Sequence, residues 1–144
     1  ITQNVDDLHE RGGSPEVIHM HGSLLGALCA ACGHRWSATL VMRSLDPCPR
    51  CGKPATRPDI VWFGEIPYHM ERIWAAVEAA EIFAAIGTSG QVYPAAGLAQ
   101  HARRSGARTV ELNLASSAVS IDFDEVRTGP ATQVVPAWVA ELIA

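Results

Sequence analysis

Short apolar runs and helical patterns alternate along the second half of the chain. Residues 60–63 and 82–86 are apolar runs, and each is followed directly by a glycine. Runs of this length that end at a turn residue are typical of buried strands. Residues 68–80 between them predict a helix, because their apolar side chains recur at the i, i+3, i+4 and i+7 positions of one helix face: Met70, Ile73, Trp74 and Val77.

A second helix is predicted to begin at Pro94 and to run to about Ser105. Proline suits the first turn of a helix, and Gly106 follows as a residue that stops one. The remaining predicted elements are a third strand at residues 109–114, a short fourth strand at residues 133–135 and a closing helix at residues 136–143.

This alternation predicts an α/β fold with a Rossmann-like, doubly wound parallel sheet, because parallel neighbours in a sheet need a crossover connection. Such sheets bind ligands beyond the carboxyl ends of their strands. The first residues of the chain also have the character of a strand end. We therefore expect ligand contacts in the turns that follow four residues: Ile1, Phe63, Ile86 and Leu112.

Two Cys-x-x-Cys pairs interrupt the alternation. Cys29 and Cys32 form the first pair, Cys48 and Cys51 form the second, and 15 residues separate them. This spacing is typical of a closed four-thiolate zinc site, which is structural because no coordination position stays open. The alternatives are two disulfides, which need an oxidising compartment, and a redox-active Cys-x-x-Cys, which leaves one pair unexplained.

The cysteine-containing segment predicts a separate small module. Residues 26–56 are rich in proline, glycine and cysteine and have weak hydrophobic periodicity, which favours a ribbon of short strands. Residues 1–25 and 57–144 are then expected to form the Rossmann-like domain.

Composition narrows the possible functions. The chain has 144 residues, of which 48% are hydrophobic, and this is enough for a core. Its formal net charge is −4 with no basic stripe, so a nucleic acid is not an expected partner. No apolar run approaches the roughly 20 residues of a membrane span, and the cysteine usage predicts a cytoplasmic protein. Because the chain begins at Ile1 with the end of a strand, we expect a fragment of a longer protein; its oligomeric state is not indicated.

Polar residues follow the first predicted strand end. Gln3, Asn4 and Asp6 can contact ribose hydroxyls and a carboxamide, or they can cap a helix. His21 has an imidazole that titrates near neutral pH and suits a general base, although a buried structural histidine is the alternative. His19 lies two residues earlier, so both imidazoles would share one face of a strand and could bind one metal.

Two further turns have residues suited to a nucleotide. The turn at residues 87–90, Gly-Thr-Ser-Gly, exposes backbone amides and hydroxyls that can contact phosphate or ribose. Asn113 lies at the end of the third strand, where it can contact a ribose or simply form a turn. A dehydrogenase lacks support, because there is no GxGxxG fingerprint with a following acidic residue. The acidic balance also argues against a zinc ribbon that binds nucleic acid.

The motifs together resemble one family. Their order is TQNVDDLH, HMHG, two Cys-x-x-Cys pairs, RPDIVWFGE, GTSGQVYPAAGL, VELN and GPA. This combination resembles the C-terminal two-thirds of the sirtuins, the NAD-dependent protein-lysine deacylases, over essentially the whole chain. The form GTSGQVYPAAGL is similar to the bacterial class III branch, which removes acetyl groups and often succinyl or malonyl groups.

The resemblance implies a role for each matching position. His21 would be the general base, and the four cysteines the ligands of a structural zinc ion. The implied NAD contacts are Gln3, Asn4, Val5, Asp6, Gly87, Thr88, Ser89, Asn113, Leu114, Ala115 and Ala131. The implied contacts of the acyl-lysine peptide are Val61, Trp62, Phe63, Gly64, Glu65, Val92 and Tyr93.

The resemblance also implies a reaction in which NAD is consumed as a co-substrate. The acyl oxygen of the modified lysine attacks C1′ of the nicotinamide ribose, and nicotinamide leaves. The general base then helps the 2′-hydroxyl to take up the acyl group. Water then completes the reaction, and the products are free lysine, nicotinamide and O-acyl-ADP-ribose.

Two family segments do not occur in this sequence. They are the GAGxS segment, which cradles the NAD phosphates and supplies a central strand, and the following Pro-x-Phe-Arg stretch. A parallel sheet without a central strand exposes unpaired backbone, so we expect these 144 residues alone to be poorly folded or inactive. A non-catalytic, zinc-containing binding module is the alternative function. The Tyr-x-x-Arg pair that selects acidic acyl groups would also lie upstream, so the acyl preference is not indicated.

Overall fold

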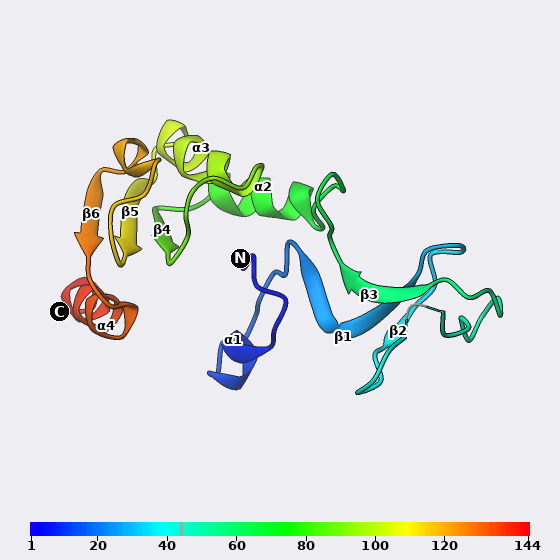
Figure 1. Ribbon diagram of the computed structural model, residues 1–144. Coiled ribbons are helices and arrows are strands. Elements are labelled where there is room, and N and C mark those ends of the chain that lie inside the picture. The colour runs from blue at the N-terminus through cyan, green and yellow to red at the C-terminus, as the bar shows by residue number, and fades with distance from the viewer. Residues whose placement is uncertain (44) are drawn as a thin grey trace. The chain divides into compact units, whose positions relative to one another are not determined.

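The chain folds into two units, Ile1–Met70 and Glu71–Ala144 (Figure 1). The computed structural model describes residues 1–43 and 45–144. None of the helices in these residues is long and apolar enough to cross a membrane, and cytoplasmic localisation stays a prediction.

A three-stranded antiparallel sheet forms the frame of the first unit. Its strands are β1 (Gly22–Cys29), β2 (Arg35–Ser37) and β3 (Thr56–Ile60), in the order β2-β1-β3. β1 and β3 pair at both ends, but the register shifts between Ser23 and Ala27. β3 contains Pro58, which an edge strand tolerates because one side of its backbone has no strand to pair with. The expected ribbon of short strands is therefore present.

The first residues of the chain pair with the segment that precedes β1. Thr2 forms a parallel bridge with His19: the Thr2 N–H donates to the Ile18 carbonyl at 2.8 Å, and the Met20 N–H donates to the Thr2 carbonyl at 3.1 Å. The Met20 side chain is fully buried. A short helix, α1 (Leu8–Arg11), follows the turn at residues 3–7. The sequence predicted the end of a strand at the first residues, and the structure has a single parallel bridge there.

The strand predicted at residues 60–63 is wrong. β3 ends at Ile60, and beyond it the chain forms a turn in which the Glu65 N–H donates to the Trp62 carbonyl at 3.0 Å. Phe63 is fully exposed and Trp62 is half exposed. The apolar run misled because it suggested burial, whereas the Trp62 ring packs beneath the guanidinium of Arg57.

A parallel sheet in the order β4-β5-β6 forms the second unit. All three strands run in the same direction, as the predicted fold class requires. The elements are α2 (Met70–Glu78), β4 (Ile82–Ile86), the 3₁₀ turn η1 (Ala95–Gly97), α3 (Leu98–Arg104), β5 (Arg108–Asn113), η2 (Ser120–Asp122), β6 (Glu125–Thr128) and α4 (Ala131–Leu142).

The core of this unit lies on β5, whose neighbours in sequence point to opposite faces. Val110 and Leu112 are fully buried and pack with Trp138 of α4. Thr109 and Glu111, on the other face, are also buried. Because both α3 and α4 contact β5, this strand is the centre of the unit.

The fourth strand was predicted at the wrong place. Residues 133–135 lie inside α4, and β6 (Glu125–Thr128) was not predicted. β6 alternates charged residues with one valine, so it lacks the apolar run that identified β4. Pro136 suggested a helix start, but it lies within α4, after the first turn. The helices predicted at residues 68–80 and 94–105 are present, the second divided into η1 and α3.

The domain division predicted from the sequence stays a prediction. β1 extends across the boundary between residues 25 and 26, and β3 extends across that between residues 56 and 57.

We expect Leu112→Ala to lower the free energy of unfolding by about 2–5 kcal/mol, since the side chain is fully buried and its removal leaves a cavity. Urea denaturation of the full-length natural protein that contains these residues measures the change. Ile121→Ala is the control: Ile121 is 86% exposed, and its truncation should change stability by less than about 0.5 kcal/mol. Equal losses in the two variants would contradict this assignment of the core.

Candidate functional site

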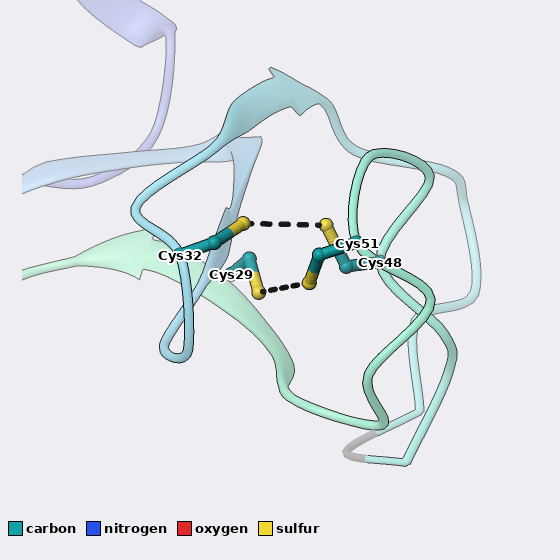
Figure 2. Close-up of side chains that lie close together, drawn as sticks. All are labelled: Cys29, Cys32, Cys48 and Cys51. Carbon is teal, nitrogen blue, oxygen red and sulfur yellow. Dashed lines mark hydrogen bonds between the residues drawn. The ribbon is translucent and has the colours of Figure 1, made fainter.

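Four cysteine sulfurs converge in the first unit (Figure 2). The Sγ atoms of Cys29 and Cys51 are 3.7 Å apart, those of Cys32 and Cys48 are 3.8 Å apart, and all four lie within 4.8 Å of one another. Tetrahedral zinc with Zn–S bonds of about 2.3 Å requires S···S distances of about 3.8 Å. The cysteines are free thiols, and these separations are far longer than a disulfide bond. The geometry therefore fits zinc.

The two cysteine turns have the same hydrogen-bond pattern. In the first turn the Cys29 N–H donates to the His34 carbonyl and the Gly33 N–H donates to the Cys29 carbonyl, each at 2.9 Å. Cys48 makes the equivalent two bonds with Lys53 and Gly52, again at 2.9 Å. Gly33 and Gly52 both have a φ of 70°, a conformation that favours glycine.

The surroundings of Cys48 favour the thiolate form of its side chain. Burial raises the pKa of Cys48, but hydrogen bonds from the backbone N–H groups of Cys51 and Arg50 and from the thiols of Cys29 and Cys51 lower that pKa to about 7. The Arg50 nitrogen lies 3.4 Å from the sulfur. In Cys32, by contrast, a backbone N–H lowers the pKa, but burial and the other cysteines outweigh it and raise that pKa. Metal binding requires thiolates, so these backbone donors favour metal uptake.

His21 lies immediately before β1, and its ring is oriented by the backbone of the first loop. Its Nδ1 is 3.2 Å from the Gln3 carbonyl oxygen. Because a carbonyl can only accept, Nδ1 is the donor, and in the neutral imidazole the lone pair is then on Nε2. A half-buried imidazole with a free Nε2 can accept a proton from a bound substrate.

Gly22 fixes the start of β1 directly after this histidine. Its φ is +78°, and a Cβ there would lie 2.1 Å from the Asp59 carbonyl oxygen. The close approach of β1 and β3 at this point therefore requires glycine. Across the same pair, the Val61 N–H donates to the His21 carbonyl at 2.9 Å.

His19 joins two parts of the loop that contains the predicted NAD contacts. Its Nδ1 lies 3.1 Å from the Asn4 carbonyl oxygen, and its Nε2 lies 2.7 Å from Glu10 Oε1. Burial lowers the pKa of His19, but these hydrogen bonds outweigh burial and raise that pKa above its ordinary value. Since both partners only accept, both ring nitrogens donate. His19 and His21 therefore bind different groups, and the shared metal considered from the sequence has no geometric support.

Asp6 lies directly before the N-cap residue of α1 and is not itself the cap. Its Oδ1 accepts the Leu8 N–H at 3.1 Å, at the start of α1. The Asn4 N–H donates to Thr2 Oγ1 at 3.1 Å. Gln3, Asn4, Val5 and Asp6 thus form one short turn beside His21, whose ring contacts the carbonyl of the first of them.

The candidate peptide segment, residues 61–65, is held by Arg57. The Arg57 guanidinium donates to both carboxylate oxygens of Glu65, at 2.6 and 2.9 Å, and lies 3.6 Å from the centre of the Trp62 ring. These hydrogen bonds, together with one from the Trp62 N–H, lower the pKa of Glu65 to about 2. These contacts connect both ends of the turn to Arg57, and the Phe63 side chain is exposed.

In the second unit, the predicted nucleotide residues lie at the carboxyl ends of the parallel strands. Asn113 Nδ2 donates to the Thr88 carbonyl at 2.7 Å, and the Gly87 N–H donates to the Leu112 carbonyl at 3.0 Å. The Gly129 N–H donates to the Asn113 carbonyl at 2.9 Å, just before α4 begins at Ala131. The turn after β4, the end of β5 and the start of α4 are thus brought together.

The other predicted residues of this unit lie on exposed turns. Leu114 and Ala115 follow β5, and Val92 and Tyr93 precede η1. Sequence reasoning assigned no role to Arg57 and Glu111, and it considered His19 only as a metal ligand. The sequence did contain a signal for Glu111, because a charged residue between Val110 and Leu112 interrupts an apolar run.

Comparison with known proteins identifies the family. The model of the Sir2 family matches residues 1–94. The chain belongs to the Sir2 family. The resemblance noted from the sequence, and the fold class with it, are therefore confirmed.

Curated bacterial relatives are about half identical to this chain. The NAD-dependent protein deacylase of Caulobacter vibrioides is 51% identical over 99% of the chain and 60% of the relative. That of Vibrio cholerae is 52% identical over 100% of the chain and 59% of the relative. That of Escherichia coli K12 is 51% identical over 52% of its own length. This Sir2 chain thus spans between 52% and 60% of the length of these three relatives.

Solved Sir2 structures have the same fold. A Sir2 homologue in complex with NAD superposes with a TM-score of 0.86 at 35% identity, covering 96% of this chain and 56% of the other. Sir2Af2 bound to a myristoylated histone peptide superposes with a TM-score of 0.82 at 29% identity, covering 96% and 62% of the two chains.

We expect the purified protein to contain about one zinc ion per chain, because four thiolates form a closed tetrahedral site. Metal analysis measures the content, and thiol titration after chelation should recover the four cysteines of the chain. Cys32→Ser should lose the metal, because three sulfurs leave the tetrahedron incomplete. Metal-free protein with two disulfides would contradict the assignment.

Proposed function

We propose that the full-length natural protein containing this chain is an NAD-dependent protein-lysine deacylase. One observation carries this proposal: His21 contacts the Gln3 carbonyl through Nδ1, which leaves the lone pair of the neutral imidazole on Nε2. The deacylase names of the relatives support it. No observation on residues 1–43 and 45–144 favours the non-catalytic binding module instead.

The residues of the first unit suit the nicotinamide end of NAD. When bound, NAD would supply an electrophilic ribose carbon that loses nicotinamide and a neighbouring hydroxyl that takes the acyl group. His21 Nε2 would remove the proton from that hydroxyl. Gln3, Asn4 and Asp6 would orient the ribose and carboxamide, since their turn is fixed by His19 and by the hydrogen bond from the Leu8 N–H to Asp6.

The residues of the second unit suit the adenosine end. Gly87 borders open space with a φ of +64°, so the backbone of the turn after β4 is accessible to a ligand. Asn113 presents a side-chain amide at the end of β5, and Thr88, Ser89 and the start of α4 lie on the same edge. Leu114, Ala115 and Ala131 would complete the adenosine contacts.

The substrate would be a peptide that contains an acyl-lysine. The turn at residues 61–65 exposes Phe63, and the turn before η1 exposes Val92 and Tyr93. We propose each turn separately as a contact of an extended peptide, which would bind through main-chain hydrogen bonds; this mode of binding accounts for tolerance of different peptide sequences. Acetyl-lysine is the first substrate to test, followed by succinyl-lysine and malonyl-lysine.

The zinc ion would have no part in the chemistry, because four protein sulfurs fill its coordination positions. Removal of the zinc ion should therefore unfold the ribbon formed by β1, β2 and β3, and any loss of activity would follow from that unfolding.

We expect His21→Ala to reduce NAD-dependent deacetylation of a peptide at least about 100-fold, the usual contribution of general base catalysis. The assay uses the full-length natural protein, and its zinc content should be unchanged. The matched control is His101→Ala: His101 pairs with Glu78 on the surface of the second unit, and its loss should change the rate less than about twofold. Full activity of His21→Ala would refute the assignment of the base.

A further inference from the structure

Glu111 is a carboxylate buried in the centre of the second unit. It lies on β5, and only 1% of the residue is exposed. No Lys, Arg or His in the described part of the chain forms an ion pair with it. Burying an unpaired charge is costly, so a glutamate at this position needs strong hydrogen-bond donors.

Three donors surround this carboxylate. The Ser120 hydroxyl donates to Oε2 through a short hydrogen bond, and the Ser117 N–H lies 3.3 Å from Oε1. Asn113 Nδ2 lies 3.4 Å from the same Oε1. Burial raises the pKa of Glu111, but these hydrogen bonds outweigh burial and lower that pKa below its ordinary value. The side chain is therefore ionised at neutral pH, and it only accepts.

The donors belong to the edge where a nucleotide would bind. Asn113 Nδ2 also donates to the Thr88 carbonyl at 2.7 Å, so one amide group is held between Glu111 and the turn after β4. Ser117 and Ser120 belong to the segment that follows β5, in which Val119 packs against Gly90: a Cβ on that glycine would lie 2.1 Å from Val119 Cγ2. The carboxylate thus connects the turns that follow β4 and β5.

We infer that Glu111 is a positioning residue for the adenosine half of the dinucleotide. It fixes the Asn113 side chain and the segment 114–120 without touching the ligand. This inference rests on the proposed function, because it assigns the edge formed by Thr88 and Asn113 to the adenosine ribose. A glutamine lacks the charge and has an NH₂ group in place of one carboxylate oxygen, so it can accept on only one side, from Ser120 or from Ser117 and Asn113.

Glu111→Gln in the full-length natural protein tests the inference. We expect the KM for NAD to rise about tenfold, the effect of losing one hydrogen bond to a charged group. The kcat and the KM for the acetyl-lysine peptide should change less than about twofold, because the groups of the first unit are intact. Ser120→Ala keeps the carboxylate and removes one donor, and it should raise the KM for NAD about threefold. If Glu111→Gln does not fold, the KM of Ser120→Ala for NAD tests the inference in its place.

Asp124→Asn is the matched control. Asp124 also accepts from β5, through the N–H and hydroxyl of Thr109 at 3.0 and 2.9 Å, but at the opposite end of the strand. Its substitution should lower the stability and leave the KM for NAD unchanged. An unchanged KM in folded Glu111→Gln would overturn the inference, and so would an equal rise in Asp124→Asn, since a purely structural role would then suffice.

Titration with ADP-ribose separates this inference from the proposed function. Glu111→Gln should bind ADP-ribose about tenfold more weakly than the natural protein. A natural protein that binds ADP-ribose but frees no lysine would refute the deacylase proposal and leave the inference intact. A natural protein that binds neither ADP-ribose nor NAD would overturn both.

Discussion

The antiparallel pairing of β1 with β3 determines the arrangement of the first unit. At one end Cys29 pairs with Thr56, and this cysteine belongs to the four-sulfur cluster. At the other end Gly22 pairs with Ile60, directly beside His21. Because the register of β1 shifts between Ser23 and Ala27, the separation of these two ends is set by the four β3 steps from Thr56 to Ile60, which at roughly 3.3 Å each come to about 13 Å. The metal can therefore hold the strands in place, but it is too far from His21 to take part in its chemistry.

The hydrogen bonds of the first loop then determine which nitrogen of His21 can act. The bridge between Thr2 and His19 brings the loop against the segment before β1. His19 fixes the loop through two acceptors, and the Gln3 carbonyl takes the proton-bearing nitrogen of His21. In the second unit Glu111 has a comparable effect on Asn113. In both units a residue outside the predicted site orients one that belongs to it.

Sequence patterns predicted the features that depend on local spacing. The cysteine pairs, the parallel-strand class and the strand at residues 82–86 were predicted because each has a short, regular signature, and the strand predicted at residues 109–114 lies one residue earlier, at Arg108–Asn113. The strand predicted at residues 60–63 was wrong, since the chain turns after Ile60 and Trp62 packs against the Arg57 guanidinium instead of entering a core. β6 was missed because it has only one apolar residue. His19 and Glu111 were not recognised as positioning residues. The hydrogen-bond partners of His19 are 9 and 15 residues away in the sequence, and those of Glu111 are 2 to 9 residues away, so only the fold shows that these side chains meet.

The most direct measurement counts the products of one reaction of the full-length natural protein with an acetyl-lysine peptide and NAD. Mass spectrometry should find one nicotinamide and one O-acetyl-ADP-ribose for each lysine freed. Free acetate with unconsumed NAD would indicate a simple hydrolase, and formation of NADH would indicate a dehydrogenase. Either of these results would contradict the proposal that His21 serves an NAD-consuming deacylation.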